Sequence, residues 1–238
     1  MSKTLRRQVF ELRFFPLASF FDSKSSLLDE LYRDPKTKKK NFEHWQVLDH
    51  RITVFDADKS RAFFFSFQNC AFSCLNPPTE NYIRDQVLRY VGISLEHFED
   101  KMENIIRAGF RETRIVPIKD FDELSQALSK NFVRTDSPFF QTLGSPVYDL
   151  TLFPIIFKHG LNKFQITLGP TKKEELKMLW GEDGDFPDQA LFLDVDYYAL
   201  QPQVTSDYKT FVAEFLIKAR ETLAKISEST EKVIGSSA

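Results

Sequence analysis

The chain carries the same short pattern near the start of each of its halves. Glu11–Leu17 reads Glu-Leu-Arg-Phe-Phe-Pro-Leu and Glu112–Ile118 reads Glu-Thr-Arg-Ile-Val-Pro-Ile, at a constant separation of 101 residues. Each reads as a strand stopped by a proline, which cannot donate a hydrogen bond to a ladder. A shared period indicates repeated architecture. The pattern therefore predicts an internal duplication, unless Glu-x-Arg is simply the solvent face of two unrelated strands.

The duplication leads to an expected arrangement of the two opening strands. If a pseudo-two-fold axis relates the halves, these strands can pair antiparallel across it, with partner numbers that add up to a constant. A sum of 125 places Glu11 opposite Arg114 and Arg13 opposite Glu112. Each cross-strand pair of opposite charge contributes up to about 1 kcal/mol. We expect this register.

Periodicity and punctuation predict an α+β fold. Two related β-α-β-β-α halves, residues 1–108 and 109–238, are expected to form an antiparallel or mixed sheet packed by helices on one side. The second half adds a strand and a long C-terminal helix. Strands are expected at 9–15, 45–55, 61–74, 110–118, 147–157, 161–168 and 191–200, and helices at 22–33, 79–91, 94–106, 120–128, 171–180 and 208–226.

Composition excludes several classes of protein. The 238 residues are 42% hydrophobic with a net charge of −2, which fits a globular chain and not a strongly basic nucleic-acid binder. No apolar run is long enough to span a membrane, and the N-terminus lacks the apolar core of a signal peptide. Two cysteines are too few for a secreted disulfide framework. We expect a cytoplasmic protein without membrane contact.

Phenylalanine is unusually abundant, with 25 of the 34 aromatic residues. Rings at 63, 65 and 67 share one face of a predicted strand, and Phe64 lies on the other. Exposed rings on a sheet could stack on RNA bases, but rings on both faces favour a strand covered on both sides and a packed core. The alternative is a cavity for an apolar ligand. Its lining residues would be Phe63, Phe65, Phe67, Phe153 and Phe157.

Two patterns could hold a metal. Cys70 and Cys74 are four residues apart on a predicted strand, about 13 Å along it, which is too far for one tetrahedral zinc. Asp194 and Asp196 resemble the paired aspartates that hold Mg²⁺ in nucleotide enzymes. The alternation of their strand instead predicts two solvent-facing carboxylates without a metal. We expect buried structural cysteines, no metal and no cofactor.

A weak anion-binding patch is expected at Arg107 and Arg111, next to Arg114. The alternative is that nearby acidic residues such as Glu112 neutralise these arginines.

The chain resembles a sporadically distributed, uncharacterised family of bacterial proteins of about this length. The resemblance rests on Phe10–Phe14, on Ala108–Arg111, on Leu193–Asp196 and on the long closing helix. It implies no known activity and no catalytic residues. The patchy distribution of the family resembles that of defence-associated genes.

These observations favour a non-enzymatic interaction module that works through a protein partner or as a homodimer, and the resemblance places it in a bacterial defence-type system. An apolar-ligand carrier is the first alternative, and a metal-dependent nucleotide enzyme using Asp194 and Asp196 is the second. Nucleic acid is not an expected partner.

Overall fold

The computed structural model describes residues 3–34, 37–98, 105–132, 142, 152–159, 162–181, 184–202 and 207–235. The helices in these ranges are α1 (Phe20–Tyr32), α2 (Tyr82–His97), α3 (Phe121–Phe132), α5 (Lys173–Trp180) and α6 (Tyr208–Gly235). The strands are β1 (Leu5–Phe14), β2 (His44–Leu48), β3 (Arg51–Phe55), β4 (Arg61–Ser66), β5 (Asn69–Leu75), β6 (Ile105–Pro117), β7 (Phe153–His159), β8 (Asn162–Lys172) and β9 (Gln189–Leu200).

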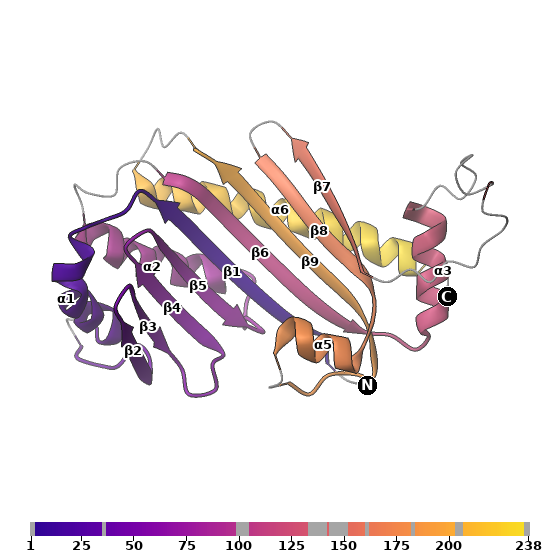
Figure 1. Cartoon of the computed structure of the whole chain (residues 1–238), viewed down its shortest axis with the longest axis horizontal. Helices are drawn as coiled ribbons and strands as arrows, with labels where there is room; N and C mark the ends of the chain where they lie inside the picture. Colours follow the sequence, from indigo (N-terminus) through magenta and orange to yellow (C-terminus); the bar gives the residue numbers. More distant parts are fainter. Residues whose placement is uncertain are drawn as a thin grey trace.

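All of these strands belong to one sheet (Figure 1), in the order β2-β3-β4-β5-β1-β6-β9-β8-β7. Every pair of neighbours is antiparallel. The sheet packed by helices confirms the predicted α+β class. From the central β1–β6 pair outward, β5, β4 and β3 on one side mirror β9, β8 and β7 on the other, which is the order that a duplication predicts.

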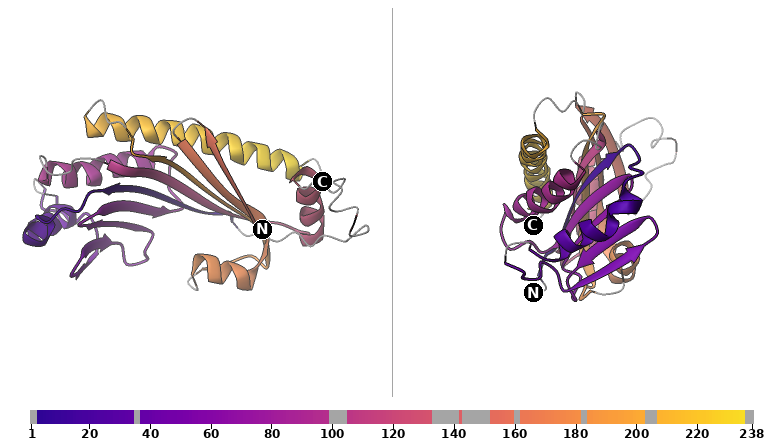
Figure 2. Two further views of the ribbon diagram at one scale, coloured as in Figure 1. Left: turned by 45° about the horizontal axis from the view of Figure 1, so that its top comes forward. Right: turned by 90° about the vertical axis from the view of Figure 1, so that its left-hand side faces the viewer.

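The two faces of the sheet differ in what covers them. The apolar sides of α1, α2, α3 and α6 join one large core with the sheet, and we call the face beneath them the helical face. The opposite, open face carries α5 at one end, where Leu176 packs on a small second cluster with Ile115 and Phe192. Figure 2 shows α6 and α2 on one side of the sheet and α5 on the other. The open face is therefore the accessible side of the strands.

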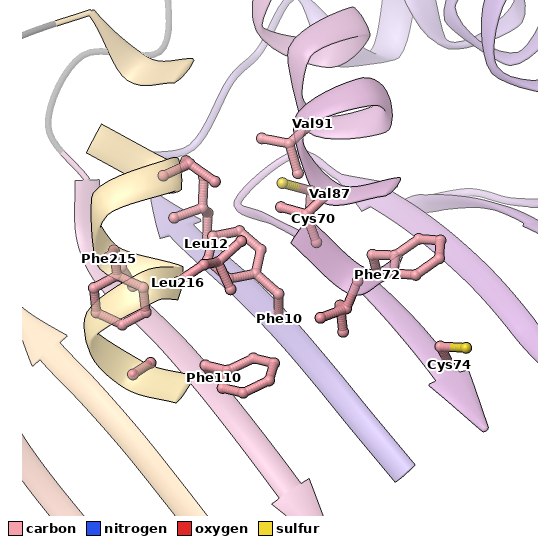
Figure 3. Close-up of a cluster of buried hydrophobic side chains, with 14 of the residues drawn as sticks. Phe10, Leu12, Cys70, Phe72, Cys74, Val87, Val91, Phe110, Phe215 and Leu216 are labelled. Carbon is pink, nitrogen blue, oxygen red and sulfur yellow. The ribbon is translucent and has the colours of Figure 1, made fainter. Parts of the chain in front are cut away.

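Alternating side chains explain why these strands bury one face. On β1, Phe10, Leu12 and Phe14 are buried, whereas the residues between them are more exposed. The ring of Phe10 meets that of Phe215 on α6 edge to face, with 6.2 Å between the ring centroids. Figure 3 shows this cluster between the sheet and the helices α6 and α2. Burial of such rings supplies most of the free energy that holds helices to the sheet.

The register between β1 and β6 corrects the prediction. The strands pair antiparallel as expected, but partner numbers add up to 120, so that Phe10 lies opposite Phe110 and Glu11 opposite Gly109. Residues 101 apart, such as Glu11 and Glu112, lie on opposite faces of the sheet. A shift of one residue exchanges the faces. The repeated Glu-x-Arg pattern therefore does not mark equivalent positions in the β1–β6 pair.

Three predicted elements were wrong. The strand at 45–55 is two strands, β2 and β3, around a turn at Asp49 and His50, and the strand at 61–74 is likewise split into β4 and β5. The helix at 94–106 does not exist as predicted, because α2 runs through to His97 and β6 begins at Ile105. The border drawn after Ala108 therefore lies inside a strand.

The caps of two helices follow the sequence signals. Before α3, the side chain of Asp120 accepts a hydrogen bond from the backbone N–H of Glu123 at 2.9 Å. Before α5, Glu175 accepts one from the N–H of Lys172 at 3.0 Å, so this box lies one residue later than Thr171 and Glu174 predict. No helix in the described ranges has the length and apolar character needed to cross a membrane.

Candidate functional site

The paired aspartates of β9 bind arginines. The Nε and Nη2 atoms of Arg111 donate to the two carboxylate oxygens of Asp194 at 2.8 and 2.7 Å, and the hydroxyl of Thr113 donates to the same carboxylate at 2.7 Å. Asp194 is only 8% exposed, which corrects the expectation of a solvent-facing side chain. A bidentate guanidinium occupies the oxygens that a Mg²⁺ ion would need.

Asp196 is held in the same way on the open face. It accepts a hydrogen bond from Arg107 at 2.6 Å, and Arg107 also donates to Glu11 at 2.7 Å. Burial raises the pKa of Asp196 above its usual value, while Arg107 and Arg111 lower it. The guanidinium of Arg107 lies 4.7 Å from the ring centre of Tyr198. Arg107 and Arg111 are therefore brought together by the sheet, but carboxylates neutralise both, and the predicted anion patch has no free charge there.

The cysteines are structural side chains. Cys70 and Cys74 are both buried and unpaired with each other, and they line the helical face of β5 (Figure 3). Burial raises the pKa of the Cys70 thiol strongly and that of Cys74 to about 11. Across the described ranges, no three His, Cys, Asp or Glu side chains are close enough together to bind a metal ion.

The five candidate phenylalanines do not line one cavity. Phe65 is fully buried, and its ring lies 5.2 Å from that of Phe98 and 5.5 Å from that of Phe14. Phe153 and Phe157 belong to β7, at the far edge of the sheet from β4. Six strand spacings of about 4.8 Å separate these strands. The rings thus form separate packed clusters, and the remaining candidates, Phe63 and Phe67, contribute to the core on the β4 side.

A groove of about 880 Å³ opens on the other side of these strands, on the open face. Its floor has small side chains, among them Val9, Ala62 and Ser73. Its aromatic walls are Phe55, Phe64 and Trp180, the last residue of α5. Phe64 was expected beneath a covering layer, and instead it borders this groove. The volume is in the range of ordinary ligand sites.

Two arginines of the groove lie on its aromatic rings. The guanidinium of Arg7 lies 4.2 Å from the ring centre of Trp180 and donates to the carbonyl oxygen of Trp180 at 3.0 Å. The guanidinium of Arg51 lies 5.6 Å from the ring centre of Phe64, and its Nε is buried without a hydrogen-bond partner. Burial lowers the pKa of Arg7, as does nearby Arg111, whereas Asp194 raises it.

Neither Arg7 nor Arg51 forms an ion pair with a carboxylate in the described part of the chain. This separates them from Arg107 and Arg111 on the same face. Stacking holds a guanidinium plane in place and leaves its edges for planar anions such as carboxylates. The groove can therefore bind an anionic group that also brings apolar surface to the rings.

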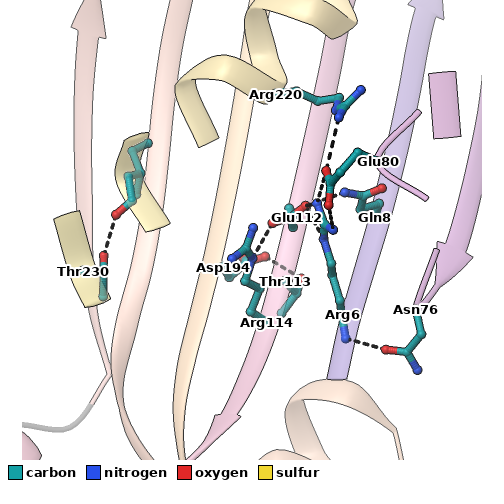
Figure 4. Close-up of polar contacts among 11 residues, drawn as sticks. Arg6, Gln8, Asn76, Glu80, Glu112, Thr113, Arg114, Asp194, Arg220 and Thr230 are labelled. Atoms are coloured by element: carbon teal, nitrogen blue, oxygen red, sulfur yellow. Dashed lines mark hydrogen bonds and ion pairs between the residues drawn. The ribbon is translucent and has the colours of Figure 1, made fainter. Parts of the chain in front are cut away.

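A second polar cluster lies on the helical face (Figure 4) and is internally balanced. Buried Glu112 accepts hydrogen bonds from Arg6 at 2.8 Å, from Gln8 at 2.5 Å and from Arg114 at 2.5 Å. Arg6 also reaches Glu80, which in turn accepts from Arg220 of α6 at 3.2 Å. These pairs tie β1, β6 and α6 together, which indicates a structural role.

The groove was missed from the sequence. Its walls come from β1, β3, β4 and α5, so that Arg7, Arg51, Phe64 and Trp180 meet only through the strand order. One signal was present, because Phe64 interrupts the polar side of its strand. We interpreted Phe64 as a covered ring, which indicated a core. Considered together with Arg51 and Phe55, the same residue could have indicated an aromatic and cationic surface.

No protein-family model matches the chain, and no curated protein matches its sequence.

Proposed function

We propose that this chain is a non-enzymatic interaction module that binds a protein partner through the open-face groove. The observation that carries the proposal is the pair of stacked arginines, Arg7 and Arg51, which lack carboxylate partners among the described residues on a face where Arg107 and Arg111 are neutralised. Uncompensated charge beside aromatic rings is typical of recognition surfaces.

The catalytic alternative has less support. The carboxylates of Asp194 and Asp196 are held by guanidinium groups, and the thiols of Cys70 and Cys74 are buried with raised pKa values. A nucleophile or a general base needs a free polar group beside a place where a substrate fits. The groove offers cations and rings, which suit binding.

A capture experiment tests the proposal. The tagged chain, its Phe64→Glu variant and its Met178→Glu variant are used as baits in an extract of the producing cell, and the bound proteins are quantified by mass spectrometry. Phe64 borders the groove, whereas Met178 is a strongly exposed apolar residue of α5 outside it. We expect a partner that the wild type and Met178→Glu retain and that Phe64→Glu loses at least tenfold.

Equal recovery on all three baits, or the absence of any specific partner, would contradict the proposal. A second copy of the chain as the main captured protein would indicate self-association instead, which native mass spectrometry of the pure protein measures directly.

A further inference from the structure

The two stacked arginines lie at opposite corners of the groove. Both arginines can be placed along β4 from the pairing of the strands. Arg7 pairs with Leu75, whose N–H donates to the carbonyl oxygen of Ser60, just before β4 begins. Arg51 pairs with Ser66, at the other end of β4. Six residues along a strand correspond to about 20 Å, and the three spacings from β3 to β1 to about 14 Å. The two Cα atoms are therefore about 25 Å apart.

The strand surface between these corners is apolar or uncharged, and the charged lining residues Asp58 and Lys59 lie beside it, in the turn between β3 and β4. Phe64 and Phe55 stand on one side, and Val9, Ala62 and Ser73 form the floor. A ligand that contacts both guanidinium groups must span this stretch and offer it apolar contacts. A single small anion or one nucleotide is too short to reach both corners.

From this spacing we infer that the groove binds an extended peptide segment with two acidic side chains eight residues apart and, between them, apolar side chains that share their face. This inference rests on the proposed function. An extended chain advances about 3.3 Å per residue, so a separation of eight residues covers about 26 Å, and the even number keeps both acidic side chains on the same face of the peptide. Each carboxylate meets one guanidinium fork, and the apolar side chains cover Phe64 and Phe55.

A single-stranded nucleic acid fits this pattern less well. Its phosphates carry charge at every nucleotide, and those in the middle would face Phe64, Phe55 and Val9 instead of cations. Binding of a phosphate chain depends on a continuous positive groove.

Fluorescence anisotropy with three labelled nonapeptides tests the inference. The first, Glu-Ser-Leu-Ser-Phe-Ser-Leu-Ser-Glu, has the predicted spacing, and its Glu, Leu and Phe side chains share one face when the peptide is extended. The second, Glu-Glu-Ser-Leu-Ser-Phe-Ser-Leu-Ser, has the same composition with adjacent carboxylates, and the third replaces both Glu of the first by Lys. A seven-nucleotide oligothymidylate and AMP complete the series. We expect the first peptide to bind at least tenfold tighter than any other probe, and its affinity to fall with added salt.

Variants then assign the binding to the two corners. Arg7→Gln and Arg51→Gln should each weaken the first peptide about tenfold, which corresponds to the loss of one charge-assisted contact. The matched control is Arg84→Gln, a partly exposed arginine of α2 outside the groove that is paired with Asp85. Circular dichroism establishes that each variant is folded before it is titrated.

Three outcomes would each overturn the inference. The oligothymidylate could bind more tightly than the first peptide, or the two acidic peptides could bind equally. The first peptide could also fail to bind at concentrations up to 1 mM, which corresponds to a binding free energy weaker than about −4 kcal/mol. If capture of the protein partner still depends on Phe64, the proposed function stands and only the inferred class of peptide is wrong. If neither partner capture nor peptide binding depends on the groove, the proposed function and the inference are both wrong.

Discussion

Truncation of Phe65 to alanine tests whether the phenylalanines of β4 form a packed core. The side chain has no exposed surface, and its ring touches those of Phe14, Phe20 and Phe98 with centroids 5.2 to 6.0 Å apart. A Phe→Ala change in a core costs about 3–5 kcal/mol. Because aromatic pairs add about 0.5–1.5 kcal/mol each, we expect a loss near the upper end, about 4.5 kcal/mol of unfolding free energy.

Urea denaturation measures this loss. With a slope of about 3 kcal/mol per molar urea for a chain of this size, the unfolding midpoint should fall by about 1.5 M. The matched control is Phe157→Ala, since Phe157 is 40% exposed and stacks on one ring, that of Phe164 at 4.7 Å. That change should cost about 1 kcal/mol. Fluorescence and circular dichroism should give the same midpoint in each variant, as a single cooperative transition requires.

A midpoint shift below about 0.5 M for Phe65→Ala, or equal shifts in the two variants, would refute the packed-core reasoning. A cavity behind Phe65 would produce that result, because the removed ring would leave few contacts.

Three further predictions concern the polar groups. Glu112→Gln leaves two arginines of the helical face without their buried carboxylate and should lower the unfolding free energy, measured by thermal unfolding, by about 3 kcal/mol. The control Glu228→Gln, in an exposed helical pair, should lower it by less than about 0.5 kcal/mol. Similar losses in the two variants would contradict the role of burial. Asp194→Asn should lower the melting temperature without changing any response to Mg²⁺, and a Mg²⁺-dependent stabilisation of the wild type that this variant lacks would restore the metal alternative. Cys70 and Cys74 should react with a disulfide reagent at pH 8 only when the protein unfolds, since burial and raised pKa values suppress the thiolate. The reactivity of the native protein should increase as the pH approaches the pKa of Cys74, about 11. A fast reaction of the native protein at pH 7 would show that the thiols are accessible.

Alternation carried most of what could be predicted of the fold. The pattern of β9 assigned Val195 and Tyr197 to one face and Asp194 and Asp196 to the other, and the structure confirms both faces. The sheet class and the long last helix followed from the same periodicities.

The turns were the weak point, because two of them contain neither glycine nor proline. Asp49 and His50 join β2 to β3, and Phe67 and Gln68 join β4 to β5, without glycine or proline. The register of β1 on β6 depends on packing of Phe10 and Phe110 under α6 and not on matching charges. In this register the charged pairs lie on diagonals, such as Arg107 with Glu11.

The central β1–β6 pair also has a consequence for how the chain folds. Phe10 and Phe110 are about 100 residues apart, whereas β3, β4 and β5 follow one another through turns of a few residues. Closing the longer loop costs about 2.5–3 kcal/mol more than closing a hairpin, so the two outer parts of the sheet should form before the centre does. During synthesis at about 5–20 residues per second, the free edge of β1 waits about 5–20 s for β6 to emerge. In that interval the N-terminal half is a partial sheet in which β1 is an unpaired edge strand. The ribosome-bound chain is then most accessible to chaperones and most prone to incorrect strand pairing.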